Sequence, residues 1–118
     1  MTQVTARTRV IVAGRSALVC ELCGQARAAQ VHHRRPRGMG GTSLTAVHTA
    51  ASLLHLCHRC HQGRVELHRA EALRMGWLLP PGADPTGEAV WLATPNGTGW
   101  WLLDDDGGSR FTTDPHRH

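Results

Sequence analysis

The chain has no long apolar run and no lysine. No uninterrupted apolar stretch approaches the roughly 20 residues that a membrane-spanning helix needs. The apolar segment Val10–Ala13 is also shorter than a signal-peptide core of roughly 7–15 residues, so we expect a cytoplasmic protein with no membrane partner. All 13 basic residues are arginine, a bias that a GC-rich genome also produces, so the missing lysine by itself indicates no function.

Charge is unevenly distributed along the 118 residues, a length typical of one small domain. Residues 1–76 contain 11 arginines and three glutamates, a formal charge of +8, whereas residues 77–118 contain two arginines and six acids, a formal charge of −4. The basic first part favours a polyanionic partner such as nucleic acid. Ordinary solvation of surface arginines is the alternative.

Four cysteines form two Cys-x2-Cys pairs, Cys20 with Cys23 and Cys57 with Cys60, separated by 33 residues. In a cytoplasmic protein such pairs are more typical of a metal site than of disulfides. The spacing allows both thiolates of a pair to bind one tetrahedral zinc ion. We therefore predict a structural zinc that joins two distant segments and stabilises a small core. A redox role for the two thiol pairs, or cysteines buried in the core without a metal, are the alternatives, although no thioredoxin-like βαβ pattern is present.

Histidine is abundant, and seven of the nine histidines lie between residues 32 and 68. The adjacent pair His32 and His33, together with His61, are candidates for metal binding and general-base catalysis, because neutral imidazole serves both purposes. Hydrolysis of a phosphodiester needs an activated water and a cation against the phosphate oxygens. Strand alternation would point His32 and His33 to opposite faces, so a shared site requires a bulge or a strand end there.

The remaining patterns predict a small α+β protein in three segments: an N-terminal arm at 1–15, a main domain at 16–80 and a C-terminal hairpin extension with its tail at 81–118. Apolar and β-branched runs predict strands at 10–12, 53–56, 88–93 and 99–103, and the segment 28–33 precedes a basic, glycine-rich loop. Apolar spacing predicts one helix from Arg64 to Met75, ended by Gly76.

Three segments in order, Cys20–Gly24, Val31–Gly41 and Leu53–His61, resemble the zinc-containing HNH endonucleases that are common in actinobacteria and their phages. The resemblance covers about residues 16–80. It implies a ββα-metal fold, in which a two-stranded hairpin packs on a helix around one catalytic divalent ion, beside the structural zinc site of the four cysteines. It also implies a metal-dependent endonuclease that hydrolyses DNA phosphodiester bonds and nicks duplex DNA. Mg²⁺, Mn²⁺, Ni²⁺ and Zn²⁺ are all open as the catalytic ion.

The resemblance also implies roles for single residues. His32 and His61 would bind the catalytic ion, and His33 would be the general base. The asparagine that orients this base in the family lies five residues before the third cysteine, where this chain has Ser52, so the resemblance implies that Ser52 is the second catalytic residue and takes this orienting role. This departure favours the alternative of a zinc-stabilised DNA-binding domain of degenerate HNH type, with weak or no catalysis.

Several further residues flank the proposed site. Arginine binds phosphate in a bidentate way and positions a DNA backbone without reading its sequence. The predicted DNA phosphate contacts are Arg34, Arg35, Arg37, Arg64, Arg69 and His68. Glu66 and Glu71 are expected to be ion-pair partners rather than metal ligands. A third possible function is that of an accessory factor that binds phage packaging proteins in the host cytoplasm. If the protein is a nuclease that cuts one strand per active site, a double-strand cut would need a homodimer.

Overall fold

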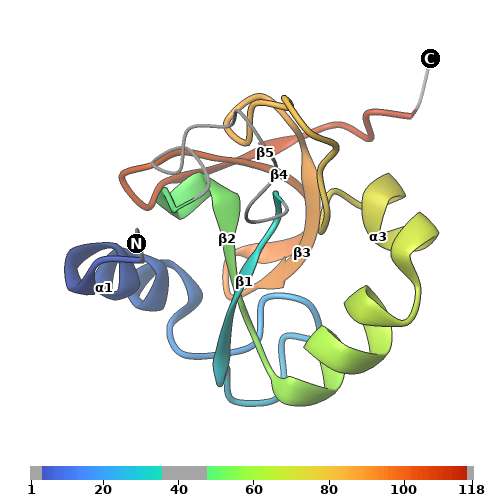
Figure 1. The fold of residues 1–118 in the computed structure, drawn as a ribbon. Coiled ribbons are helices and arrows are strands. Elements are labelled where there is room, and N and C mark those ends of the chain that lie inside the picture. The colour runs from blue at the N-terminus through green and yellow to red at the C-terminus, as the bar shows by residue number, and fades with distance from the viewer. Residues whose placement is uncertain (1–3, 36–47, 117–118) are drawn as a thin grey trace.

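The computed structural model describes residues 4–35 and 48–116, which form a small α+β structure with two antiparallel sheets (Figure 1). This confirms the predicted fold class at that level. None of the helices within these described ranges is long and apolar enough to cross a membrane. In chain order the elements are α1 (Ala6–Ser16), β1 (Gln30–His33), η1 (a 3₁₀-helix, Ala50–Ser52), β2 (Leu53–Leu56), η2 (a π-helix, Cys60–Glu66), α3 (Arg69–Arg74), β3 (Val90–Thr94), β4 (Gly97–Leu103) and β5 (Ser109–Thr112).

The first sheet is the antiparallel pair β1–β2, which lies between α1 on one side and η2 on the other in Figure 1. The register places Gln30 opposite Leu56 and His33 opposite Leu53. β2 follows η1 directly, and η2 begins four residues after β2 ends. The hairpin therefore brings the histidines of β1 close to the start of the helical segment.

The prediction of a short strand at residues 10–12 is wrong, because this stretch belongs to helix α1. Thr5 caps the helix by accepting a hydrogen bond from the Thr8 amide at 3.1 Å. Val12 is fully buried against Ala50 and Leu53. Burial of one apolar face and an N-terminal cap thus outweigh the weak strand preference of three adjacent β-branched or apolar residues.

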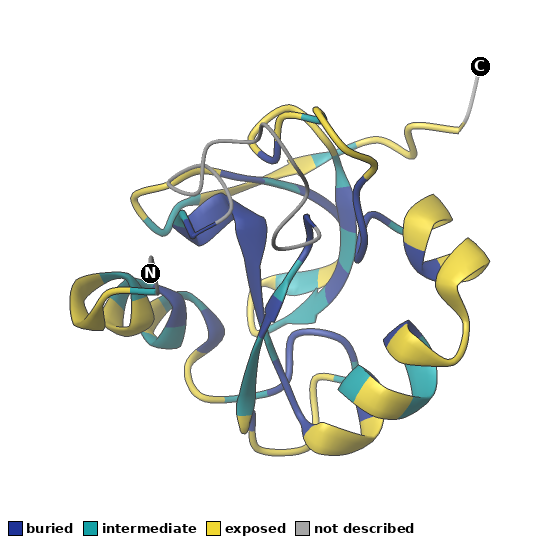
Figure 2. Ribbon diagram, in the orientation of Figure 1, coloured by how far each residue is buried: buried dark blue, intermediate teal, exposed yellow. Residues whose placement is uncertain are grey.

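The single helix predicted from Arg64 to Met75 is also wrong in its limits. The structure has the π-helix η2 from Cys60 to Glu66, then a break, and then α3 from Arg69 to Arg74. His68, before α3, has a non-helical backbone with φ −134° and ψ 63°. Most residues of α3 are exposed, as Figure 2 shows, and Ala72 is the one residue of this helix that is buried in the core.

The second sheet, β3–β4–β5, contains the two predicted C-terminal strands and a third that the sequence patterns did not indicate. Trp77 on the preceding segment, Leu92 on β3 and Trp101 on β4 belong to the same buried cluster as Leu54 and Leu56 of β2. The C-terminal segment therefore shares one hydrophobic core with the first hairpin. Burial of this apolar surface is the main stabilising contribution to the fold.

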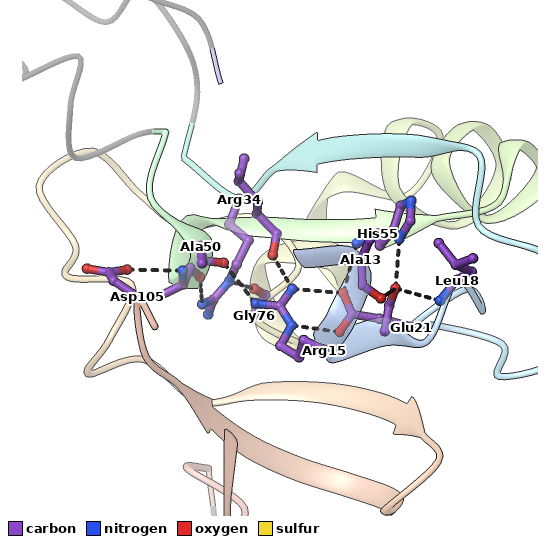
Figure 3. Close-up of polar contacts among 12 residues, drawn as sticks. Ala13, Arg15, Leu18, Glu21, Arg34, Ala50, His55, Gly76 and Asp105 are labelled. Atoms are coloured by element: carbon purple, nitrogen blue, oxygen red, sulfur yellow. Dashed lines mark hydrogen bonds and ion pairs between the residues drawn. The ribbon is translucent and has the colours of Figure 1, made fainter. Parts of the chain in front are cut away.

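Two buried arginines connect the elements around β2 (Figure 3). Arg15 forms an ion pair with Glu21 at 2.8 Å, and it also donates hydrogen bonds to the carbonyls of Ala50 and Leu53. Glu21 in turn accepts a hydrogen bond from the His55 amide at 2.8 Å. This network ties α1 to the first hairpin.

Arg34 is fully buried, and its guanidinium donates to four backbone carbonyls at 2.8–3.1 Å, those of Gly76, Ala51, Pro85 and Glu88. The sequence predicts that Arg34 contacts DNA phosphate, whereas the structure encloses its guanidinium and uses four of its five N–H donors on these carbonyls. Arg34 therefore fastens the end of β1 to η1 and to the segment between α3 and β3.

Candidate metal-dependent site

The four cysteines converge on one point. Their sulfur atoms all lie within 4.8 Å of one another, and none of the four forms a disulfide. The backbone turns support this arrangement, because Ala26 N donates to Cys23 Sγ and Cys60 N donates to Cys57 Sγ, both at 3.5 Å. Such a cluster can hold a structural metal ion such as zinc, as the sequence predicted.

The thiols of Cys20, Cys23 and Cys60 differ in how readily they ionise. Burial raises the pKa of Cys20 and Cys60. Burial also opposes ionisation of Cys23, but hydrogen bonds from the backbone of Ala26 and Gln25 outweigh it and lower the pKa of Cys23 to about 7. Buried thiols favour the neutral form unless a cation compensates the charge, so this donor set suits a tightly held metal ion.

A second group of possible ligands consists of His32 on β1 and His61 and Glu66 on η2. One ligand atom from each lies within 4.8 Å of the others. The His32 and His61 ring centroids are 5.0 Å apart, and His61 Nε2 lies 3.6 Å from Glu66 Oε1. His61 and Glu66 are five residues apart, which is the hydrogen-bond spacing of a π-helix, so η2 places both on one face.

Each of these two histidines makes one hydrogen bond to a carbonyl oxygen. His32 Nε2 lies 2.7 Å from the Trp77 carbonyl, and His61 Nδ1 lies 2.7 Å from Gln30 Oε1. A carbonyl only accepts, so these nitrogens carry the protons, and His32 Nδ1 and His61 Nε2 carry the lone pairs. Metal-binding histidines in proteins are oriented by such carbonyl partners. Burial lowers the pKa of His32 to about 4, which keeps this ring neutral.

His33 lies at the end of β1, where the strand gives way to a bend. His32 and His33 both line one cleft. The end of β1 at His33 is therefore the strand end that two adjacent residues need in order to share one site. His33 Nε2 lies 3.2 Å from His48 Nδ1. Ser52 does not take the predicted orienting role through its hydroxyl, because Ser52 Oγ is buried and has no hydrogen-bond partner among the described residues.

The cleft has a volume of about 580 Å³ and contains His32, His33, His61 and Glu66 in its lining. Its lining also includes three arginines from three separate parts of the chain, namely Arg9 on α1, Arg35 just after β1 and Arg69 on α3. Arg35 is only 8% exposed, and its Nε has no hydrogen-bond partner within the described part of the chain. A buried, unsatisfied donor is costly unless a ligand completes it.

The other predicted phosphate contacts are not brought to this cleft. Arg64 packs its guanidinium over the Trp77 ring at 4.9 Å and donates to the Leu22 carbonyl at 3.4 Å. His68 is exposed between η2 and α3 and does not line the cleft. Arg37 lies outside the described residues.

Four residues of the site were missed by the sequence reasoning: Arg9, Gln30, His48 and Glu66. Glu66 was expected to be an ion-pair partner rather than a metal ligand, yet its Oε1 lies 3.6 Å from His61 Nε2 and it is a potential ligand. Its spacing of five residues from His61 indicates a shared site only if a π-helix is anticipated. Arg9, Gln30 and His48 carry no motif, and only tertiary structure brings them together.

Comparison with known proteins identifies no relative of this chain. No family model, no curated protein and no solved structure matches it.

Proposed function

We propose that the protein is a metal-dependent endonuclease that hydrolyses phosphodiester bonds of DNA and nicks one strand of a duplex. The observation that carries this proposal is the cluster of His32, His61 and Glu66, in which a carbonyl oxygen orients each imidazole and one ring nitrogen of each keeps a lone pair for a metal ion. Arginines line the same cleft, which is the combination that hydrolysis of a charged phosphodiester requires.

His32, His61 and Glu66 would hold the catalytic ion. Two nitrogens and one carboxylate oxygen suit several first-row divalent ions. When bound, the ion supplies positive charge against the non-bridging and leaving oxygens of the phosphate. His33 accepts the proton of the attacking water, since it lies next to His32 in the chain and lines the same cleft.

The arginines of the cleft position the DNA backbone. Arg35 contributes a buried donor that a phosphate oxygen would satisfy. Arg9 on α1 and Arg69 on α3 are exposed at the rim, so they contact phosphate without a large desolvation cost. Such contacts release counterions and make binding sensitive to salt.

The second candidate function is a zinc-stabilised DNA-binding domain without turnover. The observation that favours it is Ser52, whose hydroxyl makes no hydrogen bond to His33 or to any other described residue. Both candidates predict salt-sensitive DNA binding, so only a measurement of cleavage separates them.

The test is nicking of supercoiled plasmid by zinc-loaded protein, with Mg²⁺, Mn²⁺ or Ni²⁺ added separately. We expect metal-dependent nicking that is lost in His33→Ala, with DNA affinity preserved. His116→Ala is the matched control, because its ring contacts Trp100 and the Arg74 carbonyl outside the cleft. DNA binding without nicking in any ion would overturn the nuclease proposal in favour of the binding domain.

A further inference from the structure

Residue His48 occupies the space beside the proposed general base. Its ring is nearly perpendicular to the ring of His33, with an interplanar angle of 82° and centroids 5.1 Å apart. His48 Nδ1 lies 3.2 Å from His33 Nε2, within hydrogen-bonding distance. His48 is only 8% exposed, so its imidazole is held in place rather than extended into solvent.

The backbone around His48 is fixed at a defined distance from the end of β1. Two residues after His48 the chain enters η1, which is closed by a hydrogen bond from Ser52 N to the Thr49 carbonyl at 3.0 Å. Ala51 N is further anchored to Asp105 Oδ1 at 3.1 Å. β2 then pairs with β1, with Leu53 opposite His33. These contacts make the approach of His48 to His33 a consequence of the fold.

We propose that His48 is a positioning residue for His33, and that it replaces the side chain expected at position 52. This inference rests on the proposed nuclease function. His33 Nε2–H donates to His48 Nδ1, which fixes the His33 ring and places its lone pair on Nδ1. A base with a defined tautomer and a fixed ring plane holds the attacking water in one orientation.

Ser52 cannot perform this task. Its hydroxyl is fully buried and unpartnered among the described residues, and a serine side chain is shorter than the asparagine of the family that the chain resembles. The backbone of Ser52 is instead used structurally, because its carbonyl accepts the Arg34 amide at 2.7 Å. Orientation of the base is thus moved from position 52 to position 48.

The kinetic test compares His48→Ala, His48→Gln and Ser52→Ala in plasmid nicking. We expect His48→Ala to lower the turnover rate by ~100-fold with little change in DNA affinity. His48→Gln should recover part of that loss, because a glutamine amide oxygen can also accept from His33 Nε2–H. Ser52→Ala should lower the rate far less. Equal rates for His48→Ala and the parent protein would overturn the inference while leaving the nuclease proposal intact.

A second readout does not depend on activity. Imidazole nitrogen shifts from long-range proton–nitrogen NMR spectra report which His33 nitrogen is protonated. We expect the Nε2–H tautomer in the parent protein and a mixture of tautomers in His48→Ala. An unchanged His33 spectrum would overturn the inference. A tautomer change in a protein that never nicks DNA would support the positioning contact and reject the nuclease.

Discussion

Replacement of Arg34 by methionine should destabilise the protein strongly. The change removes a fully buried guanidinium and leaves four backbone carbonyls without their donor. Burial lowers the pKa of Arg34 to about 9, with Arg15 contributing further, so the group is still charged at neutral pH. A buried carbonyl that loses its donor costs about 1–3 kcal/mol, so we expect loss of the four bonds to cost about 3 kcal/mol or more. This is a large part of the roughly 5–15 kcal/mol that stabilises a typical domain.

The assay for this prediction is urea unfolding of zinc-loaded protein, analysed only if the slope m is the same for both variants. Arg69→Met is the matched control, because Arg69 is exposed at the rim of the cleft. We expect Arg69→Met to weaken DNA binding and change the unfolding free energy by less than about 0.5 kcal/mol. Loss of less than about 1 kcal/mol in Arg34→Met would refute the reasoning from the buried network.

Three other changes test single contacts. Removal of metal from the cysteine cluster by a strong chelator should unfold the chain, because zinc binding contributes about 10–16 kcal/mol to the folding free energy of small zinc domains. Circular dichroism at constant temperature would detect the unfolding. Gln30→Ala should weaken binding of the proposed catalytic ion by about 10–100-fold, because Gln30 Oε1 orients His61. Calorimetry would measure this affinity, and an unchanged value would contradict the orienting role of Gln30. Gly76→Ala should lower the melting temperature, because residue 76 has φ +79° and an added methyl group would overlap the Ala89 carbonyl; a melting temperature equal to that of the parent would exclude backbone strain there.

Much of the framework could be predicted from sequence. The two cysteine pairs converge as their spacing indicated, and the apolar run Leu53–Leu56 forms the buried strand β2. These signals are strong because two Cys-x2-Cys pairs are typical of a metal site, and a short run of large apolar residues is typical of a buried strand. The clustering of His32 with His61 was likewise expected from their motifs.

The remaining features depend on tertiary contacts that leave no local pattern. Arg34 has the same appearance in the sequence as its neighbour Arg35, yet its guanidinium is enclosed by four carbonyls, one from η1 and three from the segment between α3 and β3. Glu66 joins the histidine cluster only because η2 is a π-helix, and the usual 3.6-residue periodicity does not anticipate that geometry. His48 carries no motif, so its approach to His33 follows only from the path of the chain into η1.

In the function proposed for this protein, a divalent ion held by His32, His61 and Glu66 enables cleavage in the cleft. The most direct measurement follows the nicking rate while one ion species is titrated into protein that already contains one zinc per chain. We predict that the rate saturates at one added ion per chain, and that His61→Ala abolishes nicking without changing its zinc content. Nicking that needs no added ion, or that persists in His61→Ala, would contradict this account.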